Sequence, residues 1–193
     1  MIQPAQIELA IDYYLQEYPD ENERLSRLIT HLKEDGVTIT DRSNMRGHIT
    51  TSMVVFSTDW QNVLLIKHKA YGIWIQPGGH YENPTTTTSA TVHLLKSALR
   101  ELEEETGVVN VTVMSPIPLD IDTHPIPARP SKNEGDHHHY DFAYFAVANN
   151  EVELTPQVEE VDGAEWVPIK NFLEEDSYLG WIVRKVLLRF HSG

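Results

Sequence analysis

Residues 100–108 read Arg-Glu-Leu-Glu-Glu-Glu-Thr-Gly-Val, a run with four carboxylates at the expected end of a helix. Apolar residues recur upstream at helical spacing, so the sequence predicts one amphipathic helix over residues 88–106 with Gly107 as its C-terminal stop. Like charges three and four residues apart repel one another, and the C-terminal end of the helix dipole disfavours anions. The acidic run is therefore expected to face a cation.

Helical geometry divides the four acids into two groups. Because each residue turns the helix by ~100°, Glu101, Glu104 and Glu105 share a face that is distinct from the leucine stripe. Glu103 projects elsewhere and is predicted to be a solvated surface acid. The alternative is an ordinary surface helix, in which Arg100 pairs with the acid four residues later and water satisfies the others.

The segment before the helix strengthens the functional interpretation. Residues 63–80 read as two short strands that end in a Pro-Gly-Gly turn. Together with Glu82 and the helix end, this turn resembles the signature of the Nudix hydrolases, which is a Gly-Gly turn and an acid followed by Arg-Glu-Leu-x-Glu-Glu-x-Gly-hydrophobic. Arg100 follows Gly79 by 21 positions, seven more than in the family pattern, and the insertion is placed at residues 83–89.

The resemblance implies hydrolysis of a diphosphate linkage in a nucleoside diphosphate linked to another moiety, with Mg²⁺ or Mn²⁺ as cofactor. Carboxylates select such hard cations, which bridge to phosphates and lower the pKa of bound water. The resemblance also implies that Glu101, Glu104 and Glu105 are metal ligands, with the Gly79 carbonyl as a further ligand. Arg100 is expected to orient Glu101, and these two residues are predicted to be catalytic.

A further acid is expected from a loop near the C-terminus. In the resembled family an additional glutamate often precedes a tryptophan, and residues 157–166 have that layout, with Trp166 at the end. Glu160 is predicted to be catalytic, as a general base or extra ligand, and Glu159 is the alternate. A solvated acidic loop is the competing interpretation.

Four residues are predicted to contact the substrate: His80, Glu82, Arg129 and His139. The first two follow the glycine turn. Arg129 belongs to the proline-rich connection over residues 116–136, which is predicted to be an irregular lid or specificity loop.

Three consecutive histidines open a predicted strand over residues 138–148. Strand alternation places His137, His139 and Asp141 on one side and His138 on the other. The local spacing lacks the ligand set typical of a zinc site. The run is therefore predicted to line the substrate pocket or to cap the strand.

The rest of the chain indicates one α/β (α+β) domain with an addition. Amphipathic periodicity predicts an N-terminal helical hairpin over residues 4–18 and 20–35, which packs on the domain or makes a homodimer contact. Residues 1–45 are assigned to this helical extension and residues 46–193 to a Nudix hydrolase domain. The resemblance implies an α/β/α sandwich with a mixed sheet. Strands are predicted over residues 47–57, 62–68, 73–76, 109–114, 138–148 and 164–167, and a terminal helix over residues 177–190.

The amino-acid composition limits the kinds of molecule that the protein is expected to bind. A net charge of −14 argues against long nucleic acid, because a polyanion binder needs a basic surface. The sequence has no apolar run near eighteen residues and no signal-peptide layout, so the expectation is a cytoplasmic protein without membrane contact that binds a small phosphorylated substrate. A Nudix-fold module that binds or senses a ligand without cleaving it remains the alternative, and other chemistry on the same fold is a third.

Overall fold

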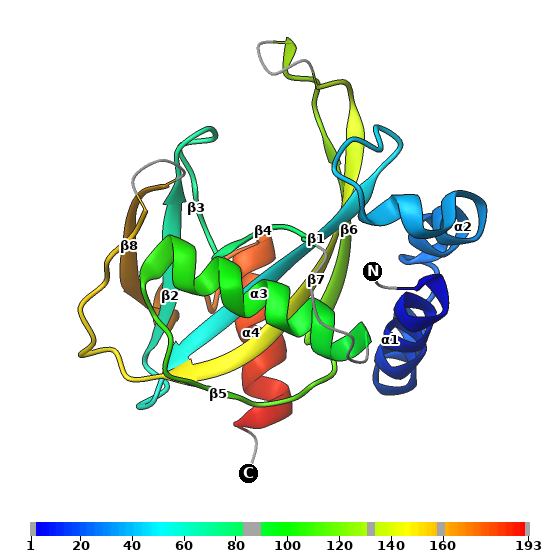
Figure 1. The fold of residues 1–193 in the computed structure, drawn as a ribbon. Coiled ribbons are helices and arrows are strands. Elements are labelled where there is room, and N and C mark those ends of the chain that lie inside the picture. Colours follow the sequence, from blue (N-terminus) through cyan, green and yellow to red (C-terminus); the bar gives the residue numbers. More distant parts are fainter. Residues whose placement is uncertain (1–2, 83–89, 131–133, 158–160, 192–193) are drawn as a thin grey trace. The chain divides into compact units, whose positions relative to one another are not determined.

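The structure, a computed structural model, describes residues 3–82, 90–130, 134–157 and 161–191 (Figure 1). The chain forms two compact units, each assembled from separate stretches of sequence. The first unit comprises Met1–Ser52, Gly79–Ala98 and Pro116–Tyr144, and the second comprises Met53–Gly78, Leu99–Ser115 and Phe145–Gly193. The predicted boundary between a helical extension, up to residue 45, and a Nudix domain, from residue 46, differs from this division into units and stays a prediction.

The elements follow the predicted order closely. The helices are α1 (Pro4–Glu17), α2 (Ser26–Asp35), α3 (Ala90–Thr106) and α4 (Tyr178–Phe190). The strands are β1 (His48–Ser57), β2 (Asn62–His68), β3 (Trp74–Ile75), β4 (Gly78–His80), β5 (Val111–Val113), β6 (Asp120–Ile126), β7 (His137–Ala148) and β8 (Val161–Pro168). None of the helices in the described part of the chain is long and apolar enough to cross a bilayer.

In the first unit, β6 corrects a prediction. The sequence predicts an irregular connection over residues 116–136, but β6 pairs antiparallel with β7, from Asp120 opposite Ala143 to Ile126 opposite His137. Among the described strands β6 has β7 as its one neighbour, and an edge strand tolerates proline because its outer side needs no N–H group. The prolines are therefore compatible with a strand. In the same unit β4 pairs with β1, which lies beside β7.

The N-terminal helices join β6 through a largely buried polar network. Asp120 is fully buried, and its Oδ1 lies 2.5 Å from Arg24 Nη2 and accepts a hydrogen bond of 2.9 Å from the Tyr14 hydroxyl. Glu21 also contacts Tyr14 and Arg24. Burial raises the pKa of Tyr14, so the phenol stays protonated and can donate. The helical hairpin thus packs on its own chain, through a charge pair that apolar periodicity could not reveal.

In the second unit the strands follow the order β3-β2-β1-β7-β5, and β8 pairs with β2. The β2–β8 ladder is antiparallel and places Leu64 opposite Trp166. Aromatic rings fill the core beside this sheet, where Phe56 and Phe145 pack edge to face with their ring centroids 5.4 Å apart. Leu94, Ala98 and Leu102 of α3 are fully buried, whereas Val92, Leu95 and Leu99 of the predicted apolar stripe are only partly buried. The core-facing side of the helix is therefore displaced from the predicted stripe.

Candidate active site

The C-terminal half of α3 carries the predicted metal ligands. The buried side of this half of the helix carries Leu102 and two of the acids. Glu101 and Glu105 are buried, at 5% and 3% exposure, whereas Glu104 is partly exposed and Glu103 is exposed. The prediction that Glu103 differs from the other three is confirmed. Buried carboxylates need a cation or hydrogen-bond donors nearby.

Arg100 joins two of the acids. Its Nη2 lies 2.5 Å from Glu101 Oε1, and its Nη1 lies 2.5 Å from Glu104 Oε2. The first contact is the one expected of a residue that orients Glu101, and the second is the i,i+4 pair expected of an ordinary surface helix. One guanidinium thus bridges two carboxylates of the acidic face.

Glu105 connects the helix to the glycine turn. The Gly78 N–H donates a hydrogen bond of 2.8 Å to Glu105 Oε2. Backbone thus approaches the acidic helix end closely at the Pro-Gly-Gly turn. Gly79, the next residue, is the middle residue of β4, and its role as a carbonyl ligand stays a prediction.

The helix ends at Gly107, as predicted. Gly107 has φ of +76°, a left-handed conformation that favours glycine, and its N–H donates to the Glu103 carbonyl at 2.7 Å. The loop that follows β7 completes this end: the Thr155 N–H donates to the Thr106 carbonyl at 2.9 Å, and the Gln157 N–H donates to the Glu104 carbonyl at 3.3 Å. The last carbonyls of α3 are therefore satisfied by a loop rather than by water alone.

The same loop leads to the predicted general base. Glu160 and its alternate Glu159 lie outside the described residues, so their predicted roles stay predictions. The chain just before them is bound to α3 through Gln157, whose carbonyl also accepts a bond of 3.4 Å from the Val161 N–H.

Replacing Gly107 with Ala is expected to lower the free energy of unfolding by about 1–3 kcal/mol, the usual scale of a non-glycine residue held in strained backbone. A Cβ at this position would also lie 2.0 Å from Thr155 Oγ1, so the loop must shift. Urea unfolding of both proteins measures the change. Gly72→Ala is the matched control, because Gly72 also has positive φ, +66°, but a Cβ there meets no atom within 4 Å. Equal losses in the two variants would show that the Thr155 contact contributes nothing.

The predicted substrate residues all lie in the first unit. Arg129 is paired with Glu134, whose Oε2 lies 2.9 Å from Arg129 Nη2, so this guanidinium already has an anionic partner. Glu82 is exposed. His80 and His139 lie in a cluster of imidazoles, with their ring centroids 5.5 Å apart. Whether any of these four residues contacts substrate stays a prediction.

Burial controls the charge of the imidazole cluster. It lowers the pKa of His80 to about 4 and that of His139 to about 2, with neighbouring charged groups, other histidines among them, adding to the effect. Burial also lowers the pKa of His48. The rings of His80 and His139 are therefore neutral near pH 7.

The predicted alternation along β7 is confirmed. His137 Nε2 lies 3.3 Å from His139 Nε2, and Asp141 accepts hydrogen bonds from Thr50 and Ser52. The next residue after His139, Tyr140, instead contacts the N-terminal helix α2.

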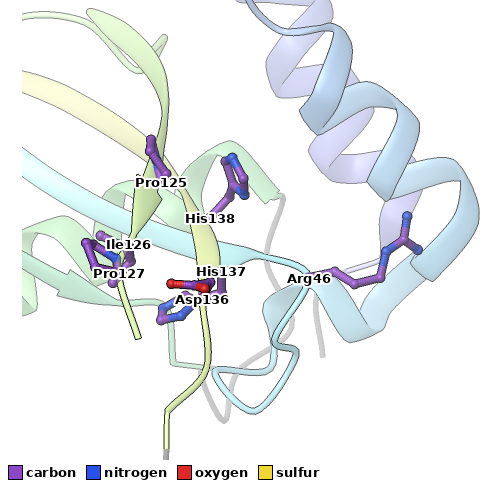
Figure 2. A pocket seen from close by; sticks show the side chains of 7 residues that line it. All are labelled: Arg46, Pro125, Ile126, Pro127, Asp136, His137 and His138. Atoms are coloured by element: carbon purple, nitrogen blue, oxygen red, sulfur yellow. The ribbon is translucent and has the colours of Figure 1, made fainter. Parts of the chain in front are cut away.

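Two of the three consecutive histidines line a pocket of about 280 Å³ beside the β6–β7 hairpin (Figure 2). Its lining comprises Arg46, Pro125, Ile126, Pro127, Asp136, His137 and His138. That the histidine run lines the substrate pocket stays a prediction.

The residues at the end of α3 match the Nudix signature. A comparison of the sequence with known protein families agrees with this match. The NUDIX domain profile matches residues 46–189, most of the chain. The chain belongs to the NUDIX domain family. The resemblance noted from the sequence is therefore confirmed for this Nudix protein. The insertion predicted at residues 83–89 lies outside the described residues and stays a prediction.

The chain is also similar to individual proteins. The Nudix chain is 28% identical over 126 residues to a probable DHNTP pyrophosphohydrolase of Lactococcus lactis subsp. cremoris (strain MG1363). The aligned region covers 65% of this chain and 69% of that protein. Among solved structures it resembles a NUDIX-family hydrolase from Clostridium perfringens, with a TM-score of 0.53, 22% identity and coverage of 75% and 98% of the two chains. It also resembles an Ap4A hydrolase from C. elegans, with a TM-score of 0.51, 17% identity and coverage of 72% and 95%. The two structural likenesses confirm the predicted α/β Nudix fold with a mixed sheet and N-terminal helices.

The donors on α3 fit a hard divalent cation. Glu101, Glu104 and Glu105 offer carboxylate oxygens, which suit Mg²⁺ or Mn²⁺ better than softer ions. Two of these carboxylates are buried, and a cation would offset the cost of that burial. The sequence did not reveal the hydrogen bonds from Thr155 and Gln157 to this end of the helix, because no local pattern joins positions that far apart.

Proposed function

We propose that this Nudix protein hydrolyses a diphosphate linkage in a nucleoside diphosphate linked to another moiety, with Mg²⁺ or Mn²⁺ as cofactor. The observation that carries the proposal is the acidic end of α3, where Arg100 contacts both Glu101 and Glu104 and the Gly78 N–H contacts Glu105. A surface helix with no further role does not require buried carboxylates on its polar face.

The residues of the chain hold the ligands in place. Arg100 fixes the orientation of Glu101 through a charged hydrogen bond, and Gly78 fixes that of Glu105 through the backbone. When bound, the metal supplies neutralisation of the diphosphate and a lower pKa for water. Positioning and charge neutralisation are the main requirements of phosphoryl transfer.

A substrate panel tests the proposal. It comprises nucleoside triphosphates, ADP-ribose, nucleotide sugars, dinucleoside polyphosphates and NADH, with DHNTP added because of the name of the Lactococcus relative. Release of phosphate, pyrophosphate or nucleotide is measured with Mg²⁺, with Mn²⁺ and with EDTA. Metal-dependent release from at least one compound is expected. Ligand binding without release from any compound would instead favour a non-catalytic binding module.

Glu160 is proposed as the general base or an extra ligand. The supporting observation is that Gln157, a few residues earlier, donates to the Glu104 carbonyl of α3. Replacing Glu160 with Gln is expected to lower kcat about a hundredfold, a typical loss when a general base is removed. Steady-state kinetics on the best substrate of the panel measures the loss, and Glu153→Gln serves as the control in the same connection. An unchanged rate would remove Glu160 from the site.

A further inference from the structure

Three histidines far apart in the sequence come together in the first unit. His48 is the first residue of β1, His80 is the last residue of β4, and His139 lies near the start of β7. β4 pairs with β1, and β1 lies beside β7, so three neighbouring strands each supply one ring. Sequence spacing could not show this set, because only strand pairing brings the three positions together.

The nitrogens of these rings are close enough to share one ion. One ring nitrogen of each lies within 4.8 Å of the other two. Zn²⁺ binds imidazole nitrogen at about 2.0–2.1 Å with tetrahedral geometry, which puts two ligand nitrogens about 3.3 Å apart. Side-chain rotations that move the nitrogens by about 1 Å are therefore sufficient to close the set around an ion.

His48 has the hydrogen-bonding pattern of a metal ligand. Its ring is 2% exposed, and its Nδ1 faces the Asn44 carbonyl at 3.2 Å, so Nδ1 carries the hydrogen. Its Nε2 therefore presents a lone pair, and this atom is buried with no hydrogen-bond partner among the residues that the structure describes. A buried acceptor left in that state costs about 1–3 kcal/mol. Metal-bound histidines characteristically direct the second nitrogen to a carbonyl or carboxylate in this way.

A neighbouring ring orients His139. His137 Nδ1 faces the Gly135 carbonyl at 2.8 Å, so His137 Nε2 presents a lone pair toward His139 Nε2 at 3.3 Å. A hydrogen bond from His139 to His137 then leaves the other nitrogen of His139 as an acceptor. The His137 ring also stacks on His48, with the centroids 4.9 Å apart. Two of the three rings are thus held by partners that leave a lone pair for a ligand.

We propose that His48, His80 and His139 form a binding site for a borderline divalent ion of the Zn²⁺ class, separate from the carboxylates of α3. Neutral imidazole selects Zn²⁺, Ni²⁺ or Cu²⁺ over Mg²⁺, whereas the carboxylates have the opposite preference. Three histidines with a fourth position for water or an anionic group are the ligand set of an open zinc site. The Nudix signature residues take no part in it.

Metal binding to the untagged full-length protein tests the site. Isothermal titration with Zn²⁺ in the presence of excess Mg²⁺ is expected to show one Zn²⁺ bound per chain. His80→Gln and His139→Gln should each weaken Zn²⁺ binding at least a hundredfold, more than the 10- to 100-fold loss usual for a residue that only supports a ligand. His138→Gln is the matched control, because it lies next to His139 on the opposite face of β7. It should leave Zn²⁺ affinity unchanged, as should Glu104→Gln.

A second measurement needs no variant. Imidazole resonances of the wild-type protein, followed by NMR during Zn²⁺ addition, should shift or broaden for His48, His80 and His139 before those of the other histidines. The proposal is overturned if Zn²⁺ binds equally well to His80→Gln and His139→Gln, or if Glu104→Gln alone abolishes binding. It is also overturned if the wild-type resonances of the three rings do not respond.

Discussion

Replacing Glu104 with Gln is expected to lower metal-dependent kcat/KM by about 10³. A bound metal contributes several kcal/mol of transition-state stabilisation, and each 1.36 kcal/mol corresponds to a tenfold change in rate. Glu104 is the best of the three acids for this test, because its side chain is 41% exposed and its neutral amide can be accommodated. Glu101 and Glu105 are buried, and their replacement would also affect folding.

Glu103→Gln is the matched control for this experiment. It changes the same residue type on the same helical turn, removes the same charge, and points away from the acidic face. Steady-state kinetics over a range of Mg²⁺ concentrations compares the two variants, and urea unfolding checks that both are folded. Equal activity of the Glu103 and Glu104 variants would contradict the proposed metal site.

Replacing Arg24 with Met is expected to lower the free energy of unfolding by about 3 kcal/mol. The change removes the cation that faces Asp120, a carboxylate with no exposed surface, and retains the apolar stem of the side chain. Breaking a buried ion pair by removing one partner usually costs 3–5 kcal/mol. The lower end of that range is expected because 33% of the Arg24 side chain is exposed.

Arg27→Met supplies the control, because Arg27 is exposed near the start of α2 and its removal changes the net charge equally. Urea unfolding of the two variants measures the difference. Adding Asp120→Asn to Arg24→Met should recover part of the loss, because the unpaired charge is then gone. If Arg24→Met is no less stable than Arg27→Met, the pair does not anchor the N-terminal helices.

Local patterns predicted most of the elements. The leucine stripe gave α3 almost to the residue, and Gly107 ended it, because helix periodicity and the C-terminal glycine act over a few residues. The strand β6 was missed because its prolines read as a loop when the pairing with β7 is unknown. The short strand β4 was missed because it contains two glycines, whose role is set by the strand beside them.

The candidate sites also differ in whether a local pattern or the pairing of strands brings their residues together. Glu101, Glu104 and Glu105 could be found from sequence because one helix carries all three. His48, His80 and His139 could not, since three strands contribute one residue each and the closeness depends on their pairing. The sequence did predict that His137 and His139 share a side, because alternation along one strand is local. The ion pair between Asp120 and its partner near the start of α2 could not be predicted from the sequence either, because ion pairs leave no periodic pattern.

The hydrogen bonds from Thr155 and Gln157 to the last carbonyls of α3 couple the opening of the helix end to the opening of the loop that follows β7. Fraying of the final helical turn must release the loop, and detachment of the loop exposes the final turn to water, so the two open as one cooperative unit. We therefore expect amide hydrogens on both sides of that junction to share one opening free energy in hydrogen-exchange measurements. A cation bound by the glutamates, as proposed above, would stabilise the closed junction and so raise the hydrogen-exchange protection of backbone that it does not contact.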